Sequence, residues 1–358
     1  MILLNPGPVT LSARVRSSLL GPDLCHRESE FFDLQDELRS GLLAAYQCDA
    51  AAWSAVLLTG SGTAAVESML TSLVPEAGAV LIAENGVYGE RMAQICARFR
   101  IPHERLPGDW LQALDLAGLE RRLTAGSAGT RFTHLAVVHH ETTTGRLNPL
   151  APLSELCRSH GVGLLVDAVS SFGAEEIDVQ HESLVALAAT ANKCLHGVPG
   201  VAFVLARRGA VGKGASRSYY LDLARLARLQ DERNTPFTPA VQACYALAEG
   251  LREFAEQGGR PARYRRYAAL AEQVRVGLAA LGVAALLPPE DSSVVLRSYR
   301  LPAGVHYQGL HDALKNAGFV IYAGQGGLAD SIFRIAHMGE ISAGDMARLL
   351  ECMAEFLP

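Results

Sequence analysis

The sequence is short of the features that mark secreted, membrane-bound or nucleic-acid-binding proteins. Its seven cysteines are an odd number without a C-x-x-C pair, so neither a disulfide framework nor a zinc site is predicted. No apolar run approaches the roughly 20 residues that span a bilayer, and the N-terminus lacks the basic start of a signal peptide. The formal net charge is only −5. We therefore expect a reduced, cytoplasmic protein with no metal, membrane or nucleic-acid partner.

What the sequence does contain is an alternation of short apolar runs and helical patterns. With 358 residues, of which 49% are hydrophobic, the chain can bury a large core and favours two domains over one. Runs rich in Val, Leu and Ala occupy 54–59, 79–83, 134–138, 162–166, 184–189 and 201–206, with helical spacing between them, as in 63–73 and 150–160. This pattern predicts an α/β fold whose mostly parallel sheet is covered by helices on both faces.

The composition of the sequence changes near residue 250, where a long, arginine-rich helical pattern begins. Shorter strands are expected after it, around 293–299, 318–322 and 332–336. We therefore expect an N-terminal segment and large domain over 1–250 and a smaller α/β domain over 251–358.

A glycine-rich turn, T-G-S-G-T-A-A (59–65), joins a predicted strand to a predicted helix. Such turns let backbone N–H groups approach an anion, and Ser61 and Thr63 add hydroxyl donors around Gly62. The stretch also fits the dinucleotide pattern G-x-G-x-x-A, with Glu84 ending the next strand. Alone, the turn is compatible with a phosphate site, a plain tight turn or a nicotinamide cofactor.

Two charged residues follow neighbouring apolar runs where charge is unusual. Asp167 comes directly after the run at 162–166, and Lys193 follows the run at 184–189. The carboxyl ends of parallel strands meet at one edge, so both side chains could enter one pocket. Taken singly, Asp167 could be a helix cap, and Lys193 could be one half of a buried salt bridge or an amine whose pKa is lowered by desolvation.

Together these features match the needs of one cofactor, pyridoxal 5′-phosphate. The glycine turn would hold its phosphate, Lys193 would form the Schiff base, and Asp167 would keep the pyridine nitrogen protonated so that the ring accepts electrons. A nicotinamide enzyme would leave Asp167 and Lys193 without roles. We therefore predict a pyridoxal-phosphate enzyme with Lys193 and Asp167 as its catalytic residues.

Seven segments spread over nearly the whole chain share their sequence and order with one known family. They are N-P-G-P-V-T (5–10), G-S-G-T-A-A-V-E (60–67), N-G-V-Y-G-E-R-M (85–92), H-H-E-T-T-T-G-R-L-N-P (139–149), V-D-A-V-S-S-F-G (166–173), A-N-K-C-L-H-G-V-P-G (191–200) and F-R-I-A-H-M-G-E (333–340). In these segments the chain resembles the class V aminotransferases of fold type I. The resemblance implies transfer of the amino group of 2-aminoethylphosphonate to pyruvate. Glyoxylate-using relatives, which take it from alanine or serine, are the alternative.

The resemblance also implies roles for individual residues. Tyr88 would stack on the pyridine ring, Thr143 would donate to the ring oxygen or the substrate, and Arg334 would clamp the keto acid carboxylate. The ordinary alternatives are a core tyrosine, a turn hydroxyl and a surface salt bridge. The phosphate would be held by Ser61, Gly62, Thr63, Thr190 and, from the neighbouring subunit of a homodimer, Thr238. Asn5 would contact the substrate.

Three loops depart from the resembled pattern, and all three are expected to border the substrate pocket. They are Cys25-His26-Arg27-Glu28, T-P-F-T-P-A (235–240) and Ala323-Gly324-Gln325. Arg27, with His26 beside it, is our candidate for the phosphonate of the donor, unless it pairs with Glu28 or Glu30 on a solvated loop. His139, His140 and Glu141 could suggest a metal, but adjacent strand residues face opposite sides, so we expect a structural role.

Overall fold

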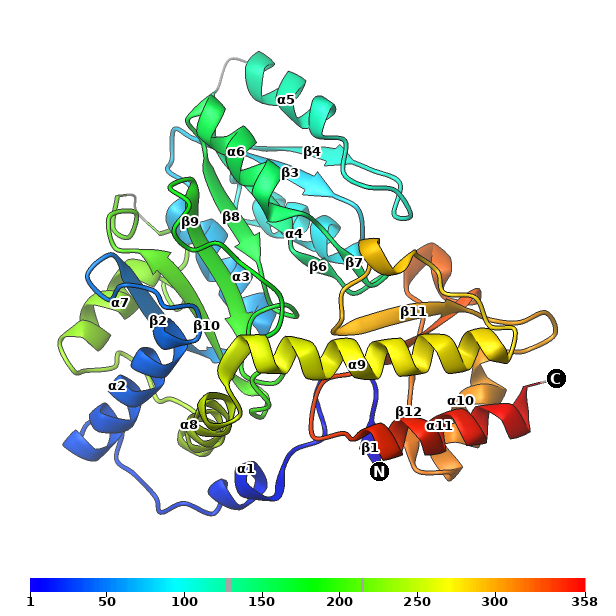
Figure 1. The fold of residues 1–358 in the computed structure, drawn as a ribbon. Helices are drawn as coiled ribbons and strands as arrows, with labels where there is room; N and C mark the ends of the chain where they lie inside the picture. Colours follow the sequence, from blue (N-terminus) through cyan, green and yellow to red (C-terminus); the bar gives the residue numbers. More distant parts are fainter. Residues whose placement is uncertain (127–130, 214–215, 358) are drawn as a thin grey trace.

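A central sheet of seven strands organises the computed structural model, which describes residues 1–126, 131–213 and 216–357 (Figure 1). Its strands are β2 (Trp53–Gly60), β3 (Ala79–Glu84), β4 (His103–Pro107), β5 (Phe132–Val138), β8 (Gly163–Asp167), β9 (Leu184–Thr190) and β10 (Gly200–Arg207). The order across the sheet is β2-β10-β9-β8-β5-β3-β4, and only β10 runs antiparallel to its neighbours. The predicted mostly parallel sheet is confirmed, and the six apolar runs lie in its strands, except that Val162 directly precedes β8.

Helices cover both faces of this sheet. One face carries α2 (Ser29–Ala44), α5 (Leu116–Ala125), α6 (Leu150–His160) and α8 (Val241–Glu256), and the other carries α3 (Gly62–Leu73), α4 (Val87–Arg98) and α7 (Leu223–Asp231). Side chains alternate between the two cores, so that Leu81 packs on the first face while Val80 and Ile82 pack on the second. Among the described residues, none of the helices combines the length and the apolar character that a membrane crossing requires.

The chain beyond α8 forms a smaller α/β unit. Its helices are α9 (Gly259–Ala280), α10 (Tyr307–Asn316) and α11 (Ala343–Phe356), and β11 (Leu296–Arg300), β14 (Ile332–Ala336) and β13 (Tyr322–Ala323) form its sheet in that order. Short 3₁₀ turns cover Pro289–Asp291 and Gly326–Leu328. The predicted helix after residue 250 is α9. The strands that follow it in the chain lie close to the positions predicted from the sequence.

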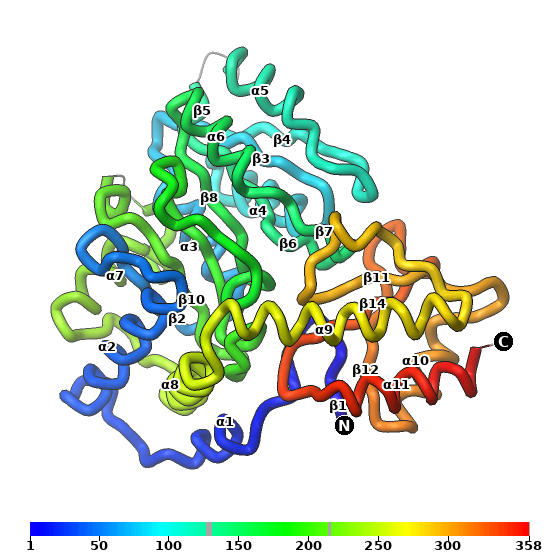
Figure 2. The backbone as a smooth tube through the Cα atoms, in the orientation of Figure 1, coloured from blue at the N-terminus to red at the C-terminus, as the bar shows by residue number. Residues whose placement is uncertain are grey.

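The first residues of the chain lie beside this C-terminal unit rather than on the central sheet. β1 (Ile2–Leu3) pairs in parallel with β12 (Phe319–Val320), and Leu4 belongs to the same apolar core as Phe319 (Figure 2). The chain then passes through α1 (Ala13–Ser18), which contacts α8, before it reaches the central sheet. The division at residue 250 falls inside α8 and stays a prediction.

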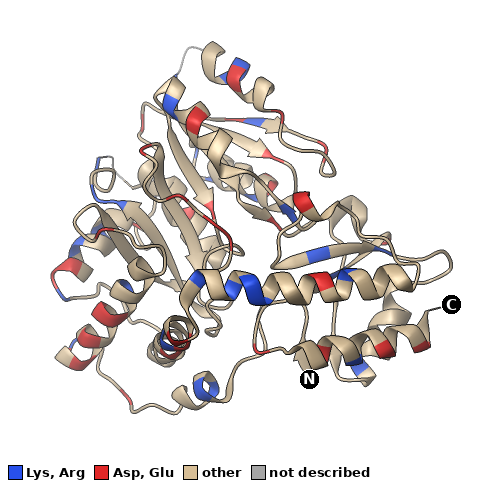
Figure 3. Ribbon diagram, in the orientation of Figure 1, with Lys and Arg blue, Asp and Glu red and all other residues tan. Residues whose placement is uncertain are grey.

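Acidic and basic residues are interspersed over the elements, with a basic stretch in the first half of α9 (Figure 3). Two of its arginines point into the protein. Arg263 is 3% exposed and donates to the Cys194 carbonyl, and Arg266 donates to the carbonyls of Gly339 and Ile341. This basic stretch therefore connects α9 to neighbouring segments, including the one that follows Lys193.

Candidate active site

The predicted cofactor residues gather at one edge of the central sheet. Because β2, β8 and β9 point in the same direction, their carboxyl ends bring together Ser61, Asp167 and Thr190. Ser61 precedes the first turn of α3, so the backbone N–H groups of that turn face the edge. Lys193 follows Thr190 in a short turn. The glycine turn is thus the predicted strand-to-helix connection.

Lys193 is enclosed by the N-terminal loop. Its Nζ donates to the carbonyl of Pro6, and a Cβ added to Gly7 would lie 2.7 Å from that nitrogen. Gly7 also has a φ of +110°, which other residues rarely adopt. Burial lowers the pKa of the Lys193 amine to about 8. The chain therefore provides a lysine that loses its proton more easily than an exposed one.

Asp167 is a buried carboxyl group at the end of β8. Its Oδ1 accepts a hydrogen bond from the Val169 N–H at 2.9 Å. Burial raises its pKa to about 6, against the opposing charges of Arg91 and Lys193. In the described part of the chain no cation lies within ion-pair distance of it. A buried carboxylate without a cation suits a ligand that brings a positive charge.

A small cavity adjoins Asp167 and is lined by Thr63, Val66, Tyr88, Arg91, Asp167 and Val169. It places Tyr88 and the first turn of α3 around the carboxyl group. Arg91 was not singled out from the sequence. Its guanidinium lies 4.6 Å from the centre of the Tyr88 ring and donates to Thr63 Oγ1 at 3.3 Å. The signal that could have found it is its position three residues after Tyr88, on the same face of a helix.

Glu141 is a second residue that sequence reasoning missed as part of the site. It lies in the short hairpin of β6 (His140–Glu141) and β7 (Arg146–Leu147), is fully buried, and accepts from the backbone N–H of Tyr88 at 3.2 Å. Thr143 Oγ1 accepts from Val87 N at 3.1 Å and donates to Glu141 at 2.6 Å. Together they cap α4, whose own N-cap, Gly86, has no side chain.

This cap bears on two of the predicted residues. Gly86 approaches Glu141 so closely that a Cβ there would lie 2.3 Å from the carboxyl carbon. Thr143 was expected to donate to the cofactor or the substrate, but in the structure its hydroxyl proton goes to Glu141. Tyr88 therefore owes its position to the hairpin. Burial raises the pKa of Glu141 to about 7.

Arg334 is the most deeply buried cation of the site. It is 0% exposed, and its Nε and Nη1 donate to the carbonyls of Ala323 and Thr142, both at 2.7 Å. Its Nη2 is buried and has no hydrogen-bond partner among the described residues. Asn5, in the loop that covers Lys193, likewise has a buried Oδ1 without a partner. Both residues thus offer polar atoms for a ligand, and a surface salt bridge at Arg334 is excluded.

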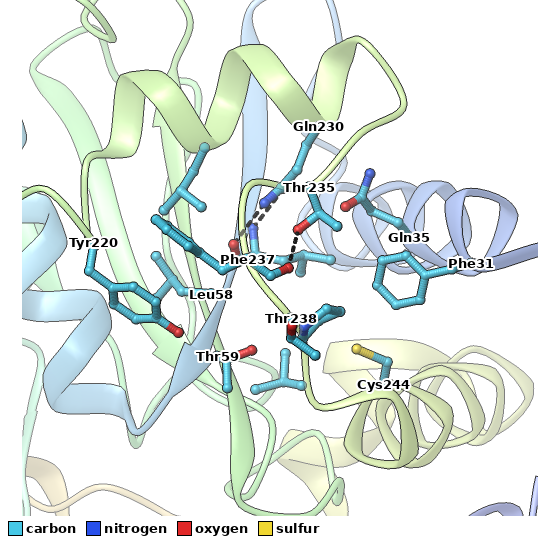
Figure 4. Close-up of a pocket in the computed structure, with 14 residues that line it drawn as sticks. Phe31, Gln35, Leu58, Thr59, Tyr220, Gln230, Thr235, Phe237, Thr238 and Cys244 are labelled. Carbon is cyan, nitrogen blue, oxygen red and sulfur yellow. Dashed lines mark hydrogen bonds between the residues drawn. The ribbon is translucent and has the colours of Figure 1, made fainter. Parts of the chain in front are cut away.

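The remaining predicted residues are not brought to this cavity within one chain. Thr190 is buried, but its hydroxyl lies 2.9 Å from Asn192 Oδ1 and 3.1 Å from the Val201 carbonyl. Thr238 is exposed and lines a separate pocket beside Thr59 (Figure 4). Arg27 is exposed and His26 half-buried in the loop between α1 and α2, and no ion pair with Glu28 or Glu30 occurs in this described loop.

Two other possibilities raised by the sequence can be compared with the structure. Glu84 is buried and forms a two-pronged ion pair with Arg105, at 2.6 and 2.7 Å, so it is not free to bind a ribose. His139 and His140 contact Ser171 Oγ and the Ser170 carbonyl, and burial lowers both pKa values to about 3. Over the described ranges, no three potential metal ligands cluster.

Comparison with known proteins identifies the class. Residues 24–340 match the model of the class V aminotransferases, and the chain belongs to that family. A relative from Aeromonas hydrophila, named 2-aminoethylphosphonate–pyruvate transaminase, is 38% identical over 99% of this chain and 94% of its own. A relative of the same name from Bacteroides fragilis strain YCH46 is 35% identical over 99% and 98%.

Solved structures agree with this assignment. An aspartate aminotransferase of subgroup IV from Thermus thermophilus has a TM-score of 0.90 and 27% identity, covering 100% of this chain and 99% of its own. An alanine–glyoxylate aminotransferase from Nostoc sp. has a TM-score of 0.91 and 26% identity, covering 100% and 95%. The fold is that of fold-type I aminotransferases, as predicted. The protein is a pyridoxal-phosphate transaminase. The Lys193 amine with its lowered pKa and the Asp167 carboxylate, which has no cation partner among the described residues, fit that cofactor.

Proposed function

We propose that this transaminase moves the amino group of 2-aminoethylphosphonate to pyruvate, giving phosphonoacetaldehyde and L-alanine. The observation that carries the proposal is the similarity over 99% of the chain to relatives of that name, at 38% and 35% identity. The buried guanidinium of Arg334, whose Nη2 has no partner in the described part of the chain, supports an anionic substrate.

In this proposal Lys193 and Asp167 have different tasks: Lys193 acts at the aldehyde of the cofactor and Asp167 at its ring nitrogen. Bound pyridoxal phosphate supplies an aldehyde for an amine and a ring that accepts the electron pair left when a proton departs. Lys193 Nζ would hold the cofactor through its aldehyde carbon and, once the amine of the donor has replaced it there, would carry the proton to and from the substrate carbon. Burial lowers the pKa of its free amine to about 8, which suits that task. Asp167 holds the proton on the ring nitrogen.

The other residues bind and orient. The phosphate of the cofactor would be held by Ser61, Gly62, Thr63, Thr190 and the partner's Thr238, and Tyr88 would stack on its ring. Thr143 acts chiefly by fixing the start of α4, because its hydroxyl proton is already used by Glu141. Arg334 and Asn5 bind the carboxylate of the keto acid.

The donor has a phosphonate and no carboxylate, whereas the acceptor has a carboxylate and no phosphonate. We assign the phosphonate to Arg27, assisted by His26. Since these residues do not line the cavity of their own chain, this assignment requires that the loop serve the neighbouring subunit.

We propose that the working unit is a homodimer with its sites at the interface. Support comes from the surface around Thr238, where Tyr220 is 44% exposed and lies tilted against the ring of Phe237 (Figure 4). Tyr219, which is 75% exposed, meets the same ring edge-on. Exposed aromatic side chains in one patch are typical of a protein interface. A cytoplasmic location, expected from the unpaired cysteines, belongs to the same proposal.

A second candidate, transfer from alanine or serine to glyoxylate, is favoured by the loops at 25–28 and 235–240. The decisive experiment is a panel of 2-aminoethylphosphonate, alanine and serine, each with pyruvate and glyoxylate, in which the product amino acid is measured by chromatography. Formation of alanine from 2-aminoethylphosphonate and pyruvate at the highest kcat/KM supports the proposal. Activity only with glyoxylate and an amino acid would replace it by the second candidate.

A further inference from the structure

The surroundings of Arg334 are unusual because a buried cation is held only by neutral groups. Besides the carbonyls of Ala323 and Thr142, Nη1 donates to the side-chain oxygen of Gln325 at 3.1 Å. Tyr322 lies against the guanidinium, 5.1 Å from ring centre to the central carbon. In the described part of the protein no carboxylate reaches ion-pair distance of Arg334. Burial accordingly lowers its pKa.

Backbone hydrogen bonds fix the main chain around Gln325, whose side-chain oxygen accepts from Arg334 Nη1. It precedes the 3₁₀ turn of Gly326–Leu328, and its carbonyl accepts from Leu328 N at 3.1 Å. The preceding Gly324 donates to the carbonyl of Ile332, two residues before Arg334. The carbonyl of Thr142, in the β6–β7 hairpin of the large domain, accepts from the same nitrogen. Nη1 is therefore fixed from both parts of the chain, and Nη2 is left without a hydrogen-bond partner among the described residues.

The chemistry of the amide matters as much as its position. A carboxylate at 325 would also accept from Nη1, but it would neutralise the charge that a substrate anion needs. A side chain without an acceptor would leave a second buried N–H group unsatisfied and the guanidinium free to turn. Only a neutral acceptor at position 325 both holds the guanidinium of Arg334 in place and leaves its positive charge uncompensated.

We propose that Gln325 is a positioning and specificity-determining residue for the keto acid. It directs Arg334 Nη2 toward the substrate carboxylate while leaving the positive charge uncompensated, so the site selects small carboxylate anions over neutral carbonyl compounds. This inference rests on the proposed role of Arg334.

The test compares pyruvate with pyruvamide, which is similar in shape but has no charge. The variants are Gln325→Glu, Gln325→Met and, as a matched control, Gln308→Glu, the same change at an exposed glutamine of α10. Two measurements are made on cofactor-loaded enzyme: the ratio of kcat/KM for pyruvate to that for pyruvamide, and the Kd of pyruvate by calorimetry.

We expect Gln325→Glu to lower the pyruvate-to-pyruvamide ratio by about 10- to 100-fold and to raise the Kd of pyruvate to a similar degree. Gln325→Met should lower the ratio less, because the charge remains and only its direction is lost. Gln308→Glu should leave both quantities unchanged. A general disturbance of folding would reduce turnover of both compounds together and leave the ratio intact.

Equal losses for pyruvate and pyruvamide, or no loss, in both Gln325 variants would overturn the inference. Arg334→Met separates this failure from failure of the proposed function. If Arg334→Met loses pyruvate binding while the Gln325 variants keep it, only the role of Gln325 is wrong. If Arg334→Met and the wild type bind pyruvate equally, the proposed role of Arg334 is wrong and the inference goes with it.

Discussion

Burial shifts the pKa values of Lys193 and Asp167 in opposite directions. Burial disfavours the charged form of each, so the pKa of the lysine falls to about 8 while that of the aspartate rises to about 6. Between these values both groups still carry their charges. The site therefore holds a protonated amine that can be deprotonated at little cost and a carboxylate ready for a cationic ring nitrogen.

Lys193 is expected to carry the cofactor. Borohydride reduction of the cofactor-loaded enzyme, followed by peptide mapping, should place the pyridoxyl group on Lys193, because its amine lies under the N-terminal loop and has a lowered pKa. Lys193→Ala should still bind the cofactor without a covalent link but lose turnover. Recovery of the label on Lys213 or Lys315 would refute the assignment.

Asp167 is expected to act on the rate rather than on substrate binding. Asp167→Asn keeps the shape but removes the negative charge that holds a proton on the ring nitrogen. We expect kcat to fall by at least about 100-fold while the KM of the amino donor changes much less, as steady-state kinetics would show. A loss within about tenfold, equivalent to roughly 1.4 kcal/mol, would mean that this carboxylate does not control the chemistry.

At the scale of elements, the sequence predicted the strands whose residues form continuous apolar runs. β9, for example, reads Leu184–Thr190 against the predicted 184–189. It did not predict β4, because His103–Pro107 is a partly exposed edge strand with alternating polar residues. The pairing of β1 with β12 was also missed, since two-residue strands from opposite ends of the chain leave no periodic pattern.

The same limit explains which site residues were found. Asp167, Lys193 and the glycine turn follow strands directly, so strand direction alone brings them together. The cap that Glu141 and Thr143 place on α4 depends on a tertiary contact between a hairpin and a helix 50 residues earlier, as the separations of 53 and 56 residues show. Gly86 and Glu141 gave no local signal of that contact.

The buried Glu141 carboxyl group of this cap should make the free energy of unfolding depend on pH. Burial raises the pKa of Glu141 from 4.5 to about 7, so between these values the folded protein binds more protons than the unfolded chain. The contribution of Glu141 to stability is then greatest at low pH and declines as pH rises through this window, by up to about 3 kcal/mol. Glu141→Gln should remove that decline in urea unfolding measured from pH 5 to 8.

The control for this prediction is Glu104→Gln, which changes a carboxyl group on the partly exposed strand β4. It should leave the pH profile of unfolding close to that of the wild type. An unaltered slope in Glu141→Gln would mean that the carboxyl group titrates near its ordinary value, contrary to its burial.

At the scale of the whole molecule, we propose that the site of one chain is completed by a residue of a second chain. Thr238 lies on the surface in a patch with Tyr219 and Tyr220, away from the cavity beside Asp167. We therefore propose that this residue contacts the phosphate of a second copy. Closed two-fold assemblies are the commonest oligomers, and in such a dimer each subunit would give its Thr238 to the other's site. We expect sedimentation at assay concentrations to report a dimer.

Mixed dimers test the exchange of residues between subunits. Lys193→Ala disables its own site, and Thr238→Asp, which places a negative charge against the phosphate, should disable the site of the partner. In a mixed dimer both defects then fall on one site and the other site is intact. Random reassociation of equal amounts should restore about a quarter of the wild-type activity.

Each variant alone should remain inactive under the same unfolding and refolding treatment, which serves as the control. If Thr238 instead served the site of its own chain, every site in the mixture would contain one of the two defects, and mixing would restore nothing. The recovered activity therefore distinguishes a site shared across the interface from two sites that each belong to one chain, even where sedimentation gives a dimer in both cases.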